Sequence, residues 1–550
     1  MPSTPPLLDH PTLQCRLHGK DFSTVTQYRG LKYASISGRW RDSIPVNSLP
    51  TNAVGTFDAT HFGPSCPQKP GAQAWDLTLV GDEVLPNENG QAGSERFDEF
   101  ECLHVDVTVP KSGCKDGKPM PVFAWVHGGG LSMGANSWPQ YEIRRFIERS
   151  VKIGKPVIGV SINYRVGILG FLASKELGIT GNYGFKDQVN AFRWIKRHIK
   201  GFGGDAENVT ACGESAGGIS LSTLLCAEIG EGLWERCVVM SGETTLRKPR
   251  RWGWHEEMYR EQLKLLGLEG LRTAVRVKKL KSMTAEDMYE KLPLASHWCA
   301  LIDGRFIKDD VNLSTLADGR NEVGKRSWCK EFVVGNTAHD GTILKARILA
   351  NPSALTNLHQ LSTSLLSPSD SRLLLEAYNL DPPSTSSTAS AILRDRILTL
   401  ASELRFHLPA LLVHEGWLKR GLKAHRYHFH VPNPITGAFT GLASHELDIA
   451  HLLQNWNHLL PKTHREVAKS MADRWIGFMN GEGWANEGRV VVFEEDGVTS
   501  LGNEEYDEVA RYGRGAVLKR IGGDKLWRLA EAWQGVRPDE DIHKGSKAKL

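Results

Sequence analysis

The chain has 550 residues, of which 40% are hydrophobic and 24% are charged, as in an ordinary globular protein. Its 67 basic and 63 acidic residues leave a formal net charge of +4, which is too small to indicate a nucleic-acid partner. No apolar run approaches the roughly 18 residues of a membrane span, so the sequence predicts no membrane-spanning helix.

The two ends of the chain bear on its location. The Pro-rich start, Met1 to Pro11, lacks the basic residues and the apolar stretch of a signal peptide, so we expect an intracellular, cytoplasmic protein. The last three residues, Ala548-Lys549-Leu550, are similar to the Ser-Lys-Leu peroxisomal address, which keeps peroxisomal delivery as an alternative. We expect frayed tails over 1–12 and 538–550.

Short apolar runs alternate with helical patterns along the chain and predict the strands of a buried sheet. Such runs are typical of an α/β protein with a mostly parallel sheet. Between them, 185–199 places apolar residues three or four apart, which predicts a helix. No linker divides the chain, so we predict one domain over 1–550, with an exposed loop at 382–390. The predicted strands are 121–127, 157–163, 209–212, 237–241 and 332–335.

The cysteines and histidines give little sign of a metal. The chain has nine cysteines and none are spaced as Cys-x-x-Cys, so neither a disulfide scaffold nor a zinc site is indicated. His425, His428 and His430 lie close together, but no carboxylate or cysteine pattern converges on them. We therefore expect no metal and no cofactor.

A glycine-rich segment follows the first strong strand. His127-Gly128-Gly129-Gly130 comes directly after the apolar run that ends at Val126. In lipases and esterases an HGGG segment supplies a backbone N–H to an oxyanion hole. A flexible turn after a strand is the alternative interpretation.

A Gly-x-Ser-x-Gly motif lies about 85 residues further on. It reads Gly213-Glu214-Ser215-Ala216-Gly217, with the strand 209–212 before it and a helix-compatible stretch after it. A sharp turn from strand to helix pushes the serine hydroxyl outward and leaves no room for side chains two positions before and after. The helix that starts at Ala216 directs free N–H groups at the site, which favours an anion there. The motif predicts Ser215 as a nucleophile.

Taken together, these motifs resemble the type-B carboxylesterase and lipase family of cholinesterase-like proteins, in particular its fungal esterases. The likeness is dense from about residue 60 to 245 and continues as islands to about residue 480. It implies an α/β-hydrolase fold, with a central mostly parallel sheet and helical insertions that form a cap over the active-site gorge. The matching segments include 62–68, 125–130, 163–165, 181–184, 187–188, 202–205 and 302–306.

The resemblance also implies the remaining catalytic residues. Asp340 falls at the acid position of the family's segment, where most members carry Glu, and His445 falls at the histidine position, with His451 as the nearest competitor. The order Ser, Asp, His is the one found in α/β-hydrolases. The N–H groups of Gly129, Gly130 and Ala216 would then hold the oxyanion.

Supporting residues follow from the same resemblance. Ser241 is expected to pair with the acidic residue near the histidine, Asp448, and Glu214 stands inside the serine motif. Arg165 and Asp187 resemble a family ion pair. Cys66 and Cys102 match the ends of a family disulfide, although in a reducing compartment we expect free thiols.

The resulting hypothesis is a serine hydrolase that cleaves small-molecule carboxylic esters through an acyl-enzyme. Two alternatives stay open. The first is an acyltransferase that uses the same acyl-enzyme, as in natural-product pathways, and the second is a catalytically silent binding protein of this fold. The sequence leaves the oligomeric state and the substrate open.

Overall fold

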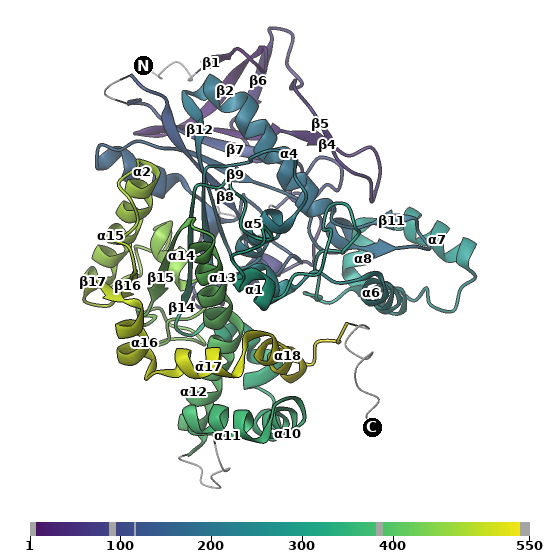
Figure 1. Ribbon diagram of the computed structural model, residues 1–550. Helices are drawn as coiled ribbons and strands as arrows, with labels where there is room; N and C mark the ends of the chain where they lie inside the picture. The colour runs from purple at the N-terminus through teal and green to yellow at the C-terminus, as the bar shows by residue number, and fades with distance from the viewer. Residues whose placement is uncertain (1–6, 87–94, 115–116, 381–388, 540–550) are drawn as a thin grey trace.

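A computed structural model describes residues 7–86, 95–114, 117–380 and 389–539 of the chain. One large twisted sheet runs through it, with helices on both faces (Figure 1). The strand order is β1-β2-β3-β7-β9-β8-β12-β13-β14-β15-β16-β17, and β6 pairs with β2. From β9 to β16 neighbouring strands are parallel, while the strands at both ends of the sheet are antiparallel. The predicted mostly parallel sheet is confirmed.

All five predicted strand segments lie in this sheet. The central strands are β8 (Met120–Val126), β9 (Ile158–Ile162), β12 (Gly204–Glu214), β13 (Arg236–Met240), β14 (Glu331–Thr337), β15 (Lys423–Phe429), β16 (Arg489–Glu494) and β17 (Gly497–Gly502). The amino-terminal strands are β1 (Leu7–His10), β2 (Cys15–Asp21), β3 (Val25–Lys32), β6 (Thr56–Ala59) and β7 (His104–Pro110). Two small pairs, β4 (Ala34–Ser35) with β5 (Ile44–Pro45) and β10 (Ala173–Ser174) with β11 (Ile179–Thr180), lie outside it.

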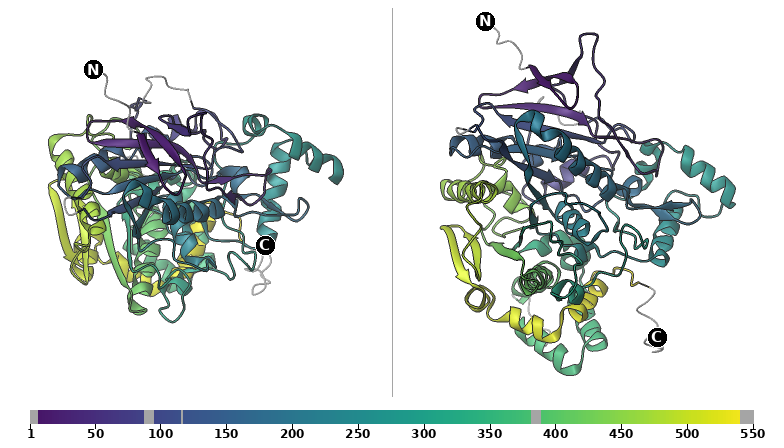
Figure 2. Two further views of the ribbon diagram at one scale, coloured as in Figure 1. Left: turned by 90° about the horizontal axis from the view of Figure 1, so that it is seen from above. Right: turned by 45° about the horizontal axis from the view of Figure 1, so that its top comes forward.

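The two faces of the sheet carry separate apolar cores, because successive side chains of a strand point in opposite directions. On β8, Val122, Ala124 and Val126 belong to one core, with Phe192 of α4 (Tyr183–His198). Phe123 and Trp125 belong to the other core, with Phe146 of α2 (Arg144–Lys152) and Trp475 of α15 (Lys462–Met479). The sheet is therefore covered on both faces, as a parallel sheet requires (Figure 2).

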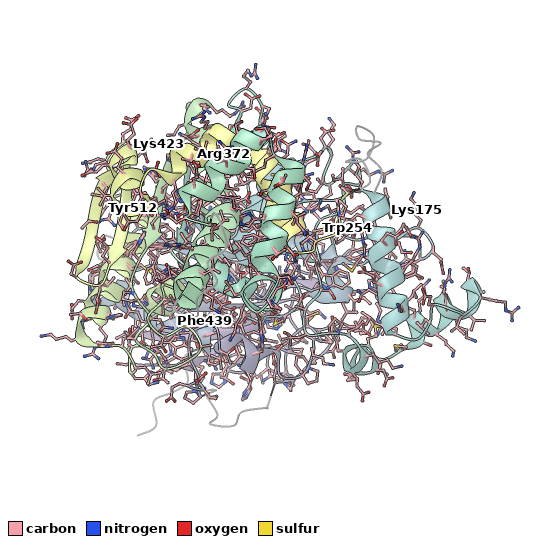
Figure 3. The ribbon with its side chains drawn as sticks, turned by 90° about the horizontal axis from the view of Figure 1, so that it is seen from below. Lys175, Trp254, Arg372, Lys423, Phe439 and Tyr512 are labelled. Atoms are coloured by element: carbon pink, nitrogen blue, oxygen red, sulfur yellow. The ribbon has the colours of Figure 1, made fainter. Side chains whose placement is uncertain are left out.

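The other helices extend this layered body. In the views of Figures 1 and 2, α6 and α7 project at one side of the sheet and α10, α11, α17 and α18 lie together at one end. Figure 3 looks onto that end, where Arg372 of α11 lies at the surface. The remaining helices are α1 (Ala72–Leu77), α3 (Gly167–Phe171), α5 (Ala216–Cys226), α6 (Trp252–Leu265), α7 (Thr273–Ser282), α8 (Ala285–Lys291), α9 (Leu313–Ala317), α10 (Ala354–Leu365), α11 (Pro368–Ala377), α12 (Ala389–Ser402), α13 (Leu408–Lys419), α14 (Leu447–Leu452), α16 (Asn503–Arg511), α17 (Arg514–Ile521) and α18 (Gly523–Trp533). Short 3-10 and π turns are η1 (Pro139–Tyr141), η2 (Ile199–Phe202), η3 (Thr244–Arg247), η4 (Asp340–Leu344), η5 (Lys345–Leu349) and η6 (Glu403–His407).

The prediction for the amino-terminal tail is wrong in part. Residues 7–10 form β1, which pairs with β2 from Leu7 to His10, so the backbone of this segment is held by a partner strand. Residues 1–6, 381–388 and 540–550, which include most of the predicted loop and the Ala548-Lys549-Leu550 address, lie outside the described residues. None of the helices that are described is long and apolar enough to cross a bilayer. The extent of the domain, 1–550, stays a prediction.

A buried ion pair ties α4 to the loop after β9, as the resemblance predicted. The Nε and one Nη of Arg165 each lie 2.7 Å from a different carboxylate oxygen of Asp187. Both side chains are almost completely shielded from solvent. Such a bidentate pair fixes geometry as well as charge.

We expect Asp187→Ala to lower the free energy of unfolding by about 3–5 kcal/mol, because it leaves the Arg165 guanidinium buried without a counter-charge. Chemical denaturation measures the change. Glu231→Ala is the matched control: it removes the exposed partner of Arg193, whose side chain is 48% exposed, and should leave the midpoint where it is. Equal midpoints for the Asp187 variant and wild type would show that the buried pair contributes nothing.

Candidate active site

Ser215 stands on a strained turn between β12 and α5. Its backbone has φ 50° and ψ −118°, a combination that a non-glycine residue adopts only under constraint. The turn is held by neighbours on both sides: the Ser215 N–H donates to the carbonyl of Met240 at 2.9 Å, and its carbonyl accepts from Ile219 at 2.8 Å. Ser215 is 8% exposed, so it remains reachable from outside the fold.

The glycines of the motif are required by close backbone contacts. A Cβ on Gly217 would lie 2.0 Å from the carbonyl oxygen of Val126, and one on Gly213 would lie 2.6 Å from the carbonyl carbon of Gly217. Real Cβ atoms do not approach backbone atoms so closely. The expected strand–turn–helix geometry is therefore present, with β8 packed directly against the turn.

The glycine loop after β8 leaves its amide groups open. Gly129 has φ 99° and Gly130 has φ 62°, and a Cβ on Gly129 would lie 2.3 Å from the carbonyl oxygen of Met133. The backbone N–H groups of Gly129, Gly130 and Ala216 donate no hydrogen bond to any residue described. Ala216 is the first residue of α5, where a helix has no internal acceptor. Three predicted donors are thus unused by the protein itself.

Asp340 and His445 lie side by side. Asp340 begins η4, just beyond the carboxyl end of β14, and His445 precedes α14. The Nδ1 of His445 is 2.7 Å from Oδ1 of Asp340, and the other oxygen of Asp340 accepts the N–H of Thr337 at 2.9 Å. Both side chains are buried. Since an aspartate only accepts, a neutral imidazole in this position carries its proton on Nδ1 and leaves Nε2 as an acceptor.

The loops that carry this pair are joined through their backbones. His339 donates its N–H to Ala443 at 2.9 Å, and its ring Nδ1 accepts the N–H of Ala443 at 3.0 Å. The N–H of His445 donates to the hydroxyl of Thr342 at 3.1 Å. Residues about one hundred positions apart are therefore held in register at the carboxyl edge of the sheet.

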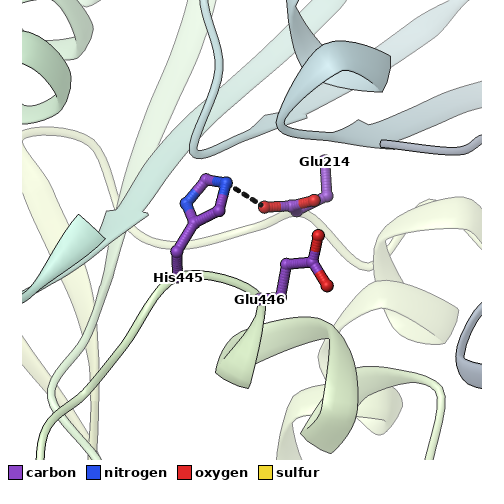
Figure 4. Close-up of side chains that lie close together, drawn as sticks. All are labelled: Glu214, His445 and Glu446. Carbon is purple, nitrogen blue, oxygen red and sulfur yellow. Dashed lines mark ion pairs between the residues drawn. The ribbon is translucent and has the colours of Figure 1, made fainter. Parts of the chain in front are cut away.

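The second nitrogen of His445 faces Glu214. Figure 4 shows the contact, in which Nε2 lies 3.3 Å from Oε1 of Glu214. No hydrogen bond joins the described side chains of Ser215 and His445. Burial, followed by the neighbouring Glu446, raises the pKa of Glu214 well above its ordinary value. The neutral acid is therefore the favoured form beside the unprotonated Nε2.

Glu214 belongs to a set of buried carboxyl groups that surrounds this histidine. Asp76, Glu446 and Asp448 are each completely or almost completely shielded. The hydroxyl of Tyr141 lies 2.9 Å from Asp76 and 3.2 Å from Glu446, but it has only one proton to donate. Burial raises the pKa of Asp76 to about 6 and that of Glu446 well above its usual range. We infer that the set shares protons.

Sequence reasoning missed Asp76, Tyr141 and Glu446. Asp76 and Tyr141 come from segments far from the serine motif, so no local spacing marks them. Glu446 directly follows the predicted histidine and has φ 68°, which rotates its side chain toward Glu214. The feature of the sequence that could have indicated Glu446 is its position directly after His445.

The expected pairing of Ser241 with Asp448 is wrong. The hydroxyl of Ser241 has no hydrogen-bond partner among the described residues. Asp448 instead accepts from the Tyr427 hydroxyl at 2.8 Å and from the N–H of Ile449 at 2.9 Å. Tyr427 lies on β15 and reaches Asp448 more directly than the serine at the end of β13.

Cys66 and Cys102 are neighbours with free thiols. Both are buried, and a hydrogen bond from Cys66, followed by burial, raises the pKa of the Cys102 thiol. The Sγ of Cys66 also accepts the N–H of Val166 at 3.5 Å. The family disulfide is therefore not formed in this structure.

Two further features of the structure resemble binding sites. Glu214, His445 and Glu446 bring three ligand-type atoms within 4.8 Å of one another, but burial favours the uncharged forms of the two glutamates, which bind cations poorly. A cavity of about 850 Å³ lies elsewhere, beside Arg29, Trp138 and Arg144, and neither Ser215 nor His445 lines it. The histidines 425, 428 and 430 do not form a metal-ligand cluster among the residues described.

Comparisons with known proteins identify the family of this chain. The family model described as "Carboxylesterase family" matches residues 12–496. The chain belongs to the carboxylesterase family. It is 32% identical to Lipase 3 of Yarrowia lipolytica over 48% of this chain and 51% of that protein, and 31% identical to the para-nitrobenzyl esterase of Bacillus subtilis over 50% of each. These alignments span about half the length of each relative.

Solved structures share the fold at low sequence identity. A carboxylesterase of Geobacillus stearothermophilus superposes with a TM-score of 0.69 at 22% identity, covering 93% of this chain and 99% of that one. A PNB esterase gives a TM-score of 0.70 at 20% identity, over 93% and 99% of the two chains. The predicted α/β-hydrolase fold is confirmed.

The stability of this protein should depend on the titration of Asp448. Burial, followed by the charge of Asp340, raises the pKa of this carboxyl from 3.8 to about 7. The folded chain then holds a proton that the unfolded chain loses near pH 4. This contribution to stability is complete below about pH 4 and is lost as the pH rises toward 7.

Asp448→Asn removes this titration and keeps an oxygen that accepts from Tyr427. Between about pH 4 and pH 8, the free energy of unfolding of the variant should rise by on the order of 3–4 kcal/mol relative to that of wild type. Urea unfolding at both pH values measures the change. Asp309→Asn, at an exposed position, is the control and should show no such trend. A constant difference between Asp448→Asn and wild type across this range would contradict the assignment.

Proposed function

We propose that the chain hydrolyses carboxylic esters of small molecules, with Ser215 as nucleophile, His445 as general base and Asp340 as its partner. The observation that carries the proposal is the 2.7 Å contact between Asp340 and His445 beside a strained serine turn. Membership in the carboxylesterase family and the unused N–H groups near Ser215 support it. The aligned relatives include a protein named as a lipase and one named as an esterase.

The reaction follows from the roles of these groups. His445 Nε2 takes the hydroxyl proton of Ser215 as Oγ attacks the ester carbonyl, and the negative oxygen is held by the N–H groups of Gly129, Gly130 and Ala216. The imidazolium then protonates the leaving alcohol, which departs and leaves an acyl-serine. Water repeats the sequence, so the acid is released and Ser215 recovers its proton.

Asp340 contributes by holding the imidazole in one tautomer and stabilising its charged form. Glu214 occupies Nε2 in the resting arrangement, at 3.3 Å. In the proposed reaction Nε2 must instead bond the Ser215 hydroxyl, so the imidazole shifts from Glu214 toward the serine when substrate enters. Glu214 is then a positioning residue, because it touches the base and not the substrate.

The first test is Ser215→Ala, assayed with p-nitrophenyl acetate and butyrate. We expect kcat to fall by about 10⁴-fold or more, because no other nucleophile replaces the hydroxyl. A fluorophosphonate label, mapped by mass spectrometry, should lie on Ser215 in the wild type. Ser364→Ala, which removes an exposed hydroxyl, is the control and should keep full activity. Unchanged turnover without labelling of Ser215 would overturn the proposal.

The second test addresses Asp340. Asp340→Asn keeps the shape of the side chain but lets an amide N–H face Nδ1, which favours the wrong tautomer of His445. We expect kcat to fall by about 10⁴-fold, with KM nearly unchanged. Circular dichroism and the unfolding midpoint check that the fold is kept. A loss of less than tenfold would remove Asp340 from its role.

A further inference from the structure

An arginine lies directly over the glycine loop. Arg247 is the last residue of η3, which begins two residues after Gly242. A Cβ on Gly130 would lie 3.5 Å from one Nη of Arg247, and a Cβ on Gly242 would lie 2.1 Å from the carbonyl oxygen of Ser215. The segment that carries Arg247 is thus packed against the serine turn, and its guanidinium faces the loop that carries Gly129 and Gly130.

The guanidinium of Arg247 makes no hydrogen bond and no ion pair with any residue that the structure describes, although the side chain is only partly exposed. Burial, followed by the positive charge of Arg347, lowers the pKa of Arg247 to about 10, so it remains charged near neutral pH. The buried guanidinium of Arg165, by contrast, is paired through two of its nitrogens with Asp187. Arg247 lacks such a partner.

The surroundings of Arg247 are positively charged. Arg250 and Arg405 share one carboxylate, Glu531, and both keep buried N–H groups without partners. Glu243 and Asp539 are further carboxyl groups nearby; burial raises the pKa of Glu243 to about 7, and neither group forms a hydrogen bond or an ion pair with Arg247. An uncompensated charge away from water is costly unless a partner of opposite charge arrives.

His297 borders the same region. Ser296, its neighbour, exchanges hydrogen bonds with the Ser132 hydroxyl at 3.2 Å, just beyond the glycine loop. Both ring nitrogens of His297 are buried without a partner. Burial, followed by Arg247, lowers its pKa well below the ordinary value, so the neutral ring offers one N–H and one acceptor.

We propose that this enzyme selects anionic esters: Arg247 binds a free carboxylate, or a similar anion, in the acid or alcohol part of the substrate, and His297 adds a hydrogen bond. The proposal deepens the proposed function and rests on it, because the anion is held beside the carbonyl that Ser215 would attack. The observation that carries the proposal is the guanidinium of Arg247, which forms no ion pair with the described residues and lies beside the glycine loop.

The test compares esters that differ only in charge. One pair places the charge in the acid part: p-nitrophenyl hexanoate against the mono-p-nitrophenyl ester of adipate. The other places it in the alcohol part: the methyl ester of para-acetoxybenzoate against para-acetoxybenzoate itself. For the wild type we expect kcat/KM of the anionic ester to exceed that of its neutral partner by about tenfold or more in one pair. The pair that responds identifies the side that Arg247 binds.

Arg247→Gln should lower that ratio by about tenfold, because only the anionic ester loses a charged partner. Arg247→Lys, which keeps the charge, should retain part of the preference. Arg372→Gln, on the surface of α11, removes one charge elsewhere and should leave the ratio unchanged (Figure 3). Because each ratio comes from one preparation, a loss of folded protein cancels.

The outcomes separate this inference from the proposed function. A wild type that hydrolyses neutral esters through Ser215, but favours the anionic member of neither pair, overturns the anionic preference alone. A preference that survives Arg247→Gln overturns the role of Arg247. Hydrolysis that survives Ser215→Ala overturns the proposed function, and the anionic preference with it.

Discussion

The architecture of this protein depends on a close backbone contact between two parallel strands and the turn that follows one of them. β8 packs so tightly against the turn after β12 that Gly217 has no space for a side chain beside Val126. This contact holds Ser215 in a conformation that costs about 1–3 kcal/mol and persists only where the surroundings over-determine it. The fully buried strands around it supply that constraint. Because the turn is rigid, the loops of Asp340, His445 and the oxyanion donors all meet at one edge of the sheet.

Burial is also what sets the chemistry on the histidine side. A single imidazole is surrounded by Asp340 and by the carboxyl groups of Asp76, Glu214, Glu446 and Asp448, all shielded from water. They cannot all ionise together, since burial and mutual repulsion raise the pKa of Glu214, Glu446 and Asp448. Asp340 accepts from the Thr337 N–H and contacts the imidazole of His445 with its other oxygen. The carboxyl groups that share protons thus surround His445, whose Nδ1 is contacted by Asp340 alone among them.

The two sides of the serine differ in charge. Carboxyl groups gather around His445, whereas Arg247, Arg250 and Arg405 gather on the side of the glycine loop. In the proposed reaction positive charge forms on the imidazole and negative charge forms on the carbonyl oxygen. In that reaction the N–H groups of Gly129, Gly130 and Ala216 meet the negative oxygen, whereas Arg247 is left for an anionic part of the substrate.

The sequence by itself determined the fold class, the serine turn and the glycine loop, and its resemblance to a family indicated the acid–histidine pair. Each of these depends on local chemistry: apolar runs of strand length, glycines where backbones touch, and motifs that keep their spacing. The tertiary structure alone decided which side chains share a proton or a charge. Asp76 and Glu446 meet through Tyr141, and Tyr427 takes the place expected for Ser241 beside Asp448. The unpaired state of Arg247 likewise appears only after folding, because the absence of a partner depends on the packing of every neighbouring element.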